Sequence, residues 1–297
     1  MKAKKIFSVR TMPYWLISPV CLLLCTLLVY PILRVFFYSF FRYSTIYSAE
    51  PQFVWFENYS KLLFQDRIFK TALPTSLRWV ITEVILQLLV GGCAALILNQ
   101  SFRGRSLART AVLIPWAVSG VLTAILWSLI FNEHIGLLND LLIRLGIMSR
   151  KMAWLGDFSL VFGSVVTAEL WRGIPFFTIS LLADMQSIPP ELYEAAKIDG
   201  ANYFNQVRYL ILPHLKDTIL LTTLLRAVWE FNNVDVIYNL TAGGPANRTM
   251  TLSMYISSVA TKNGDFGFGS TISVICFLIL TLFAIFYLKL GKFSENR

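Results

Sequence analysis

Long apolar runs constrain this chain more than any other feature of its sequence. The hydrocarbon core of a bilayer is about 30 Å thick, and a helix needs roughly 20 apolar residues to cross it. Six stretches meet that requirement, namely 15–36, 72–98, 110–131, 158–182, 215–238 and 268–290. The sequence therefore predicts an all-α membrane protein with six transmembrane helices.

Composition supports this interpretation and excludes other classes of protein. Charged residues make up only 14% of the 297 residues, whereas a soluble domain needs roughly a quarter. The net charge of +9 does not indicate nucleic-acid binding, because no basic cluster has aromatic residues interleaved with it. His134 and His214 stand alone, so no cluster has the spacing of metal ligands. We expect neither a metal nor a cofactor in this chain.

The basic residues between the apolar runs indicate an orientation in the membrane. Short cytoplasmic segments are enriched in Lys and Arg, and three segments on one side of the six-span arrangement show this bias. Their basic residues are Lys2, Lys4, Lys5, Arg10, Arg103, Arg105, Arg109, Lys289, Lys292 and Arg297. We expect a cytoplasmic N-terminal tail at 1–14, a six-span transmembrane domain at 15–290 and a cytoplasmic C-terminal tail at 291–297.

A polar insert, about 189–213, lies between the fourth and fifth apolar runs, on the same predicted side as the termini. Proline at the start and the sequence ELYEAAK predict a short helix. Asp199 and Gly200 interrupt it, because glycine reaches backbone angles that other residues avoid. The following run places Phe204, Val207 and Ile211 on one apolar face. The insert is therefore predicted to be a bent pair of short helices on the cytoplasmic surface.

The insert carries a specific resemblance. The stretch EAAKIDGANYFNQVRYLILP resembles the cytoplasmic loop of membrane subunits in binding-protein-dependent ABC importers. In such subunits this loop is a coupling helix that docks in a groove of a separate ATPase. The residues that match the pattern, and that the resemblance assigns to ATPase coupling, are Glu194, Ala195, Ala196, Asp199, Gly200, Ala201 and Pro213.

Other stretches, from about residue 13 to residue 290, resemble the carbohydrate-uptake subfamily of these permeases. They include FVWFENYSKLL, LWRGIPFFTISLLADMQSIP and the Gly-Gly-Pro loop at 243–245, which is typical of the larger membrane subunit of the maltose importer. The resemblance implies the type I ABC importer permease fold in a bacterial cytoplasmic (inner) membrane. It also implies a carbohydrate substrate, a second homologous permease subunit, two ATPase subunits that hold ATP and Mg, and an extracytoplasmic solute-binding protein.

The chain itself is predicted to be a transport subunit and not an enzyme. No GxxxxGK[ST] phosphate loop occurs, so ATP hydrolysis is expected on the partner subunits. Two alternatives stay open, namely an ABC permease for a non-sugar solute and a secondary carrier that works without ATP. The carrier is disfavoured because no inverted repeat with paired broken helices is visible.

Charged residues inside the fourth and fifth runs suggest where the solute passes. Each charge at mid-membrane costs roughly 2.5–3.5 kcal/mol, so such residues usually face a wet cavity or a partner. Arg172 and Arg226 are both predicted to lie roughly 15 Å from the cytoplasmic face. By alignment with the maltose-type subunit, the candidates for the substrate path are Arg172, Gly173, Phe176, Arg226, Trp229 and Glu230. This chain carries Trp229 and Glu230 where the maltose protein has Phe and Asn. A purely structural Arg226–Glu230 ion pair is the alternative.

Overall fold

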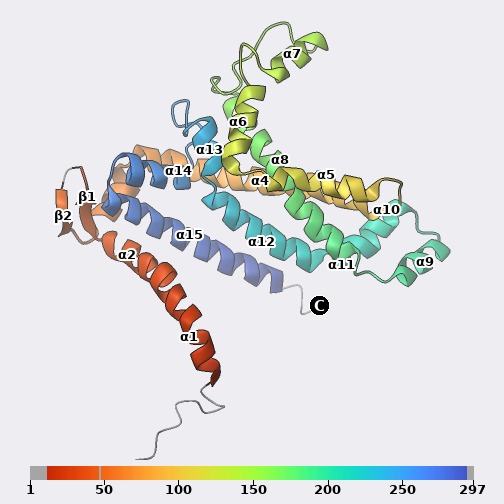
Figure 1. Cartoon of the computed structure of the whole chain (residues 1–297), viewed down its shortest axis with the longest axis horizontal. Coiled ribbons are helices and arrows are strands. Elements are labelled where there is room, and N and C mark those ends of the chain that lie inside the picture. Colours follow the sequence, from red (N-terminus) through yellow and green to blue (C-terminus); the bar gives the residue numbers. More distant parts are fainter. Residues whose placement is uncertain (1–11, 47, 293–297) are drawn as a thin grey trace, which may run out of the picture. The chain divides into compact units, whose positions relative to one another are not determined.

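The computed structural model describes residues 12–46 and 48–292, and it is predominantly helical (Figure 1). The chain divides into two compact units. The first contains the described part of Met1–Asp66 together with Ile256–Leu278, and the second contains Arg67–Tyr255 with the described part of Ile279–Arg297. The predicted tails, 1–14 and 291–297, lie largely outside the described residues.

The first unit begins with one long apolar helix, Met12–Tyr38. It is made of α1 (Met12–Leu24), a π-helical segment η1 (Cys25–Val29) and α2 (Tyr30–Tyr38). Its most apolar window has no buried residue, which fits a helix whose side chains face lipid. This helix corresponds to the predicted span 15–36.

A small hairpin and several short helices complete the first unit. Strands β1 (Phe41–Ser44) and β2 (Ser48–Phe53) pair antiparallel, with Phe41 opposite Phe53. The other elements are α3 (Glu57–Ser60), η2 (Lys61–Gln65), η4 (Ser258–Lys262) and the first part of α15 (Phe266–Lys292). The side-chain amide of Asn58 donates to the carbonyl oxygens of Ser39 and Phe41 at 3.1 and 2.9 Å, and Thr271 donates to Ser39 O at 3.0 Å. These bonds satisfy backbone acceptors where α2 ends.

The second unit is built around helices α4 and α8, which pack against each other along much of their length (Figure 1). Its elements are α4 (Arg67–Asn99), α5 (Arg105–Ala117), α6 (Gly120–Ile130), α7 (Leu137–Arg144), α8 (Val161–Met185), α9 (Pro190–Ile198), α10 (Tyr203–Gln206), η3 (Val207–Ile211), α11 (Leu212–His214), α12 (Lys216–Asn232), α13 (Asp235–Leu240), α14 (Leu252–Ser257) and the end of α15. Gly91 of α4 permits the close approach of α8, because a Cβ atom at this position would lie 2.8 Å from the Cβ of Phe177.

The stretch 110–131, predicted to be one span, is not one continuous helix. The structure has two helices there, α5 and α6, which are bent by 98° at the break between them. Val118 is extended, with φ −83° and ψ 129°, and the hydroxyl of Ser119 accepts a hydrogen bond from the Leu122 N–H at 3.3 Å. Ser119 therefore caps a new helix, and the apolar run continues in a different direction.

Four described helices are long and apolar enough to cross a membrane, and the bent pair makes a fifth if it is one span. Stretch 215–238, which was predicted to be one span, consists of α12 and the short α13, separated by Asn233 and Val234. Asn233 is extended, with φ −70° and ψ 121°. The fold is that of a multi-helix membrane protein, and the count of six spans stays a prediction.

The polar insert predicted at about 189–213 consists of short helices between α8 and α12. Helix α9 has proline at its first turn and ends at Ile198, and Gly200, two residues later, has a φ of +78°. The Gly200 N–H bonds Lys197 O and the Ala201 N–H bonds Ala196 O, at 3.0 and 2.8 Å. This pair of bonds is a Schellman motif, which requires a left-handed residue at the position of Gly200. We call residues 189–213 the elbow.

Candidate functional site

A network of charged and amide side chains connects α4, α8 and α12 inside the second unit. Its centre is Arg226, which is buried on α12. The Arg226 Nε–H donates to Oε1 of Gln87 at 2.6 Å, and its Nη2 lies 3.1 Å from Oε1 of Glu169 and 2.6 Å from Oε1 of Glu230. One guanidinium group therefore joins all three helices.

The second arginine, Arg172, shares one of these partners. Its Nε and Nη2 donate to the two carboxylate oxygens of Glu169 at 3.0 and 2.8 Å. The Glu169 carboxylate is fully buried, while the Arg172 side chain is 23% exposed. Both arginines therefore contact one carboxylate. A bidentate contact of this kind fixes the direction of the guanidinium plane.

Sequence reasoning missed two members of the network, Glu83 and Gln87 on α4. The Gln87 amide donates to Oε2 of Glu83 and to Oε1 of Glu230, both at 2.9 Å. Gly173 of α8 makes room for Gln87, because any Cβ there would collide with the Gln87 amide. The available signal was the pair of polar residues four positions apart within an otherwise apolar stretch, which places both on one helix face.

Beside the network lies a polar cavity of about 490 Å³. The cavity is lined by Glu169, Arg172, Arg226, Trp229, Glu230, Asn232, Asn233, Val234 and Asp235. Trp229 is 48% exposed, and its ring centroid lies 5.1 Å from that of Phe176. The cavity thus combines planar hydrogen-bonding groups with an aromatic surface. Of the predicted substrate-path residues, Arg172, Arg226, Trp229 and Glu230 line the cavity. Phe176 and Gly173 are outside the lining, where Phe176 contacts Trp229 and Gly173 lies against Gln87.

The network contains more acidic groups than basic ones. Three carboxylates, those of Glu83, Glu169 and Glu230, are accompanied by two guanidinium groups, and all three carboxylates are buried. Oε1 of Glu83 has no hydrogen-bond partner. Buried charges of this kind stay stable only when their partners are held in place. Among the described residues, no group of His, Cys, Asp and Glu side chains has an arrangement that fits a metal ion.

The predicted coupling residues all lie on the elbow. Glu194, Ala195, Asp199, Gly200 and Pro213 are exposed, and Ala196 and Ala201 are half-buried. Ile198 is 87% exposed at the end of α9. The elbow follows the end of α8 at Met185, roughly 24 Å along that helix from Glu169. The two groups of predicted residues therefore form separate regions and not one site.

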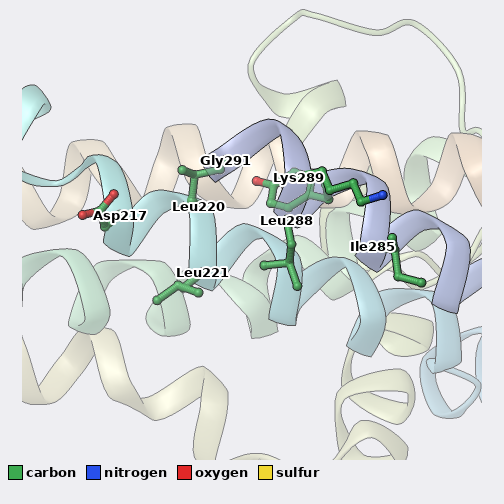
Figure 2. Close-up of a pocket in the computed structure, with 8 residues that line it drawn as sticks. Asp217, Leu220, Leu221, Ile285, Leu288, Lys289 and Gly291 are labelled. Carbon is green, nitrogen blue, oxygen red and sulfur yellow. The ribbon is translucent and has the colours of Figure 1, made fainter. Parts of the chain in front are cut away.

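A second pocket lies between α12 and the end of α15 (Figure 2). Its volume is about 570 Å³, and its lining consists of Asp217, Leu220, Leu221, Ile285, Tyr287, Leu288, Lys289 and Gly291. Figure 2 shows mainly aliphatic side chains around it, with the Asp217 carboxylate at one end. Since few polar groups line it, this pocket is poorly suited to a hydroxyl-rich solute.

Comparison with known proteins gives consistent matches. The family described as binding-protein-dependent transport system inner membrane component matches residues 87–292. The chain is 36% identical over 284 residues to the trehalose/maltose transport system permease protein MalF of Thermococcus litoralis, covering 95% of this chain and 94% of that protein. It is 32% identical to the sulfoquinovosyl glycerol transport system permease protein SmoG of Agrobacterium fabrum, with 96% and 92% covered.

Among solved structures, a bacterial ABC transporter involved in the import of the acidic polysaccharide alginate has a similar chain. The TM-score is 0.80 at 18% sequence identity, and the match covers 95% of this chain and 96% of that one. At this level of identity the similarity concerns the fold.

Proposed function

The chain belongs to the family of inner membrane components of binding-protein-dependent transport systems, and we propose that it is a permease subunit of an ABC importer for a sugar or sugar derivative. The named relatives that support this proposal transport trehalose, maltose or sulfoquinovosyl glycerol. The subunit is a multi-pass protein of the cytoplasmic membrane, and it provides the path for the solute.

The polar cavity beside Arg226 is the observation that carries the choice of solute. Sugar hydroxyls are recognised by planar polar side chains, and an aromatic ring covers the apolar face of the sugar ring. Arg172 and Glu230 supply the polar groups, and Trp229 supplies an exposed ring. The Arg226–Glu230 ion pair is compatible with this role, because both residues also line the cavity.

Energy for transport comes, in this proposal, from two ATPase subunits that bind ATP and Mg. The elbow docks one of them, with Glu194 and the exposed Ile198 at the contact. A second homologous permease completes the membrane part, and an extracytoplasmic solute-binding protein delivers the sugar. Both termini and the elbow then lie in the cytoplasm, as the distribution of Lys and Arg predicts. Nucleotide binding moves the elbow and rocks the helices between inward- and outward-facing states.

The test is ATP-driven uptake by the complete transporter in liposomes, with the solute-binding protein and a panel of carbohydrates outside. Trp229→Ala is expected to reduce uptake of the transported sugar while the complex still assembles. Trp116→Ala is the matched control, because Trp116 is also about half exposed and lies outside the cavity. Equal uptake by both variants and the parent would overturn the cavity assignment.

The same liposomes decide between the alternatives. Uptake that persists without ATP would favour a secondary carrier. Uptake of amino acids or peptides, with no carbohydrate transported, would favour a permease for another solute.

A further inference from the structure

Two arginines of α5 converge on one amide group at the end of α8. Arg105 and Arg109 lie four positions apart and point at Gln186, which follows the last residue of α8. With the Gln186 oxygen turned toward the donors, it accepts from Nη2 of Arg105 at 3.2 Å and from Nη2 of Arg109. This orientation of the amide is the one that satisfies its hydrogen bonds.

This arrangement is electrostatically unfavourable as it stands. Like charges at i and i+4 of a helix repel each other, and Arg105 is the first residue of α5, where the helix dipole also disfavours a cation. Within the described part of the chain neither arginine forms an ion pair with an acid. The Nε atoms of both are buried and have no hydrogen-bond partner. An anion between the two guanidinium groups would reduce the repulsion between them and would offset the unfavourable interaction of Arg105 with the helix dipole.

An apolar crevice adjoins the arginine pair. It has a volume of about 220 Å³ and lies between α5 and the last turns of α4 and α8. Arg109 and Gln186 line it on the polar side, and the rest of its lining is Leu98, Val112, Leu113, Thr178, Ile179, Leu182 and Ala183. Leu113 and Ile179 are 38% and 37% exposed. The arginine pair therefore lies at one end of an apolar crevice.

We propose that Arg105 and Arg109 bind the phosphate of an anionic phospholipid, and that part of its acyl chain lies in the adjoining crevice. Arginine suits this role because its planar fork matches two phosphate oxygens. In the proposed orientation the site opens to the cytoplasmic leaflet, where basic pockets between helices hold anionic headgroups. An acidic segment of the ATPase could also pair with Arg105 and Arg109, but it would leave the apolar crevice empty. The site is separate from the sugar cavity.

The experiment measures lipid retention by the purified complete transporter in detergent, using native mass spectrometry. Dioleoyl phosphatidylglycerol is titrated against dioleoyl phosphatidylcholine. Phosphatidylglycerol is expected to bind in preference to phosphatidylcholine. Arg105→Gln with Arg109→Gln is expected to weaken that binding roughly 25-fold, since each basic residue contributes about a factor of five. Arg105→Lys with Arg109→Lys is expected to keep part of the binding. Arg103→Gln is the matched control, because it removes one charge from an exposed residue of the same segment.

A second variant distinguishes a lipid from a soluble anion. Ala183→Phe fills the crevice but leaves both arginines in place, so it is expected to weaken phosphatidylglycerol binding. Inorganic phosphate at millimolar concentration is expected to compete only weakly with the lipid.

Three outcomes would overturn the proposal. One is equal phosphatidylglycerol binding by the parent and the double glutamine variant, and another is full displacement by inorganic phosphate. The third is loss of the ATPase from the double glutamine variant with lipid retention unchanged, which would assign the arginine pair to subunit docking. Thermal unfolding of each variant verifies that the complex is folded. Because the readout is lipid retention, failure here leaves the proposed sugar transport untouched.

Discussion

The Nε–H of Arg226 donates to Oε1 of Gln87 across 2.6 Å, although the two residues are 139 positions apart in the sequence. Gln87 also donates to Glu230, so its amide lies between a cation and an anion of the same helix. This amide connects α4 to the wall of the polar cavity. It contacts Arg226 and Glu230, which both line the cavity.

Replacing Gln87 by leucine is expected to destabilise the subunit by about 1–3 kcal/mol, because Arg226 and Glu230 each lose a buried hydrogen bond. Thermal unfolding of the detergent-solubilised transporter measures the effect. Gln100→Leu, at an exposed position just after α4, is the control and is expected to change the unfolding temperature little. An unchanged unfolding temperature for Gln87→Leu would mean that the amide does not hold the network together.

Two adjacent glycines of α4 are expected to respond in opposite directions to alanine. At Gly91 an added Cβ would lie 2.8 Å from Phe177 Cβ and 2.9 Å from Ile174 O, so Gly91→Ala should cost about 1–3 kcal/mol by forcing α4 and α8 apart. At Gly92 the nearest atom would be 3.7 Å away. Gly92→Ala should therefore be neutral or stabilising by up to about 1 kcal/mol. Chemical denaturation compares the two, and equal effects would contradict the close packing at Gly91.

The left-handed conformation of Gly200 makes it a sensitive position of the elbow. Gly200→Val is expected to strain the backbone by about 1–2 kcal/mol, to displace the end of α9 and to lower the number of sugar molecules transported per ATP hydrolysed. Gly146 offers a matched control, since its φ is +70° against +78° for Gly200 and neither has an atom within 4 Å of an added Cβ. Gly146→Val should carry a similar strain without loss of coupling. The same loss in both variants would show that backbone strain, and not the elbow, is responsible.

The proposed contact of Glu194 with the ATPase predicts a charge effect. Glu194→Gln is expected to weaken co-purification of the ATPase roughly ten- to a hundredfold, since a charged hydrogen bond contributes about 1.5–3 kcal/mol. Glu191→Gln removes the same charge from another exposed residue of α9 and is expected to have a smaller effect. If both variants retain the ATPase as the parent does, Glu194 is not at the contact.

The Ser119 hydroxyl caps the start of α6, and this cap can be removed by mutation. Ser119→Ala deletes the acceptor of the Leu122 N–H and is expected to destabilise the subunit by about 0.5–2 kcal/mol. Ser128→Ala is the control within α6, because the Ser128 hydroxyl only donates to Ile125 O in the same helix. Thermal unfolding separates the two variants. A Ser119 variant as stable as the Ser128 variant would indicate that packing alone sets the bend.

The sequence by itself determined the class of the protein and the short helices of the elbow. These features are local, because the length of an apolar run and the caps of a helix depend on neighbouring residues. The left-handed turn at Gly200 is an example, since both bonds of the motif lie within six residues. The long helix around Phe177 follows from its apolar run in the same way.

Only the tertiary structure decided which polar groups meet. Glu83 and Gln87 show no charge pattern that points to Arg226, and the contact depends on how α4 is rotated and how closely Gly173 lets α8 approach. The size of the bend after Ala117, 98°, could not be predicted either, because hydropathy measures the length of an apolar run and not its direction. Side-chain pairing across helices is set by their relative rotation and tilt, and packing of the whole unit determines both.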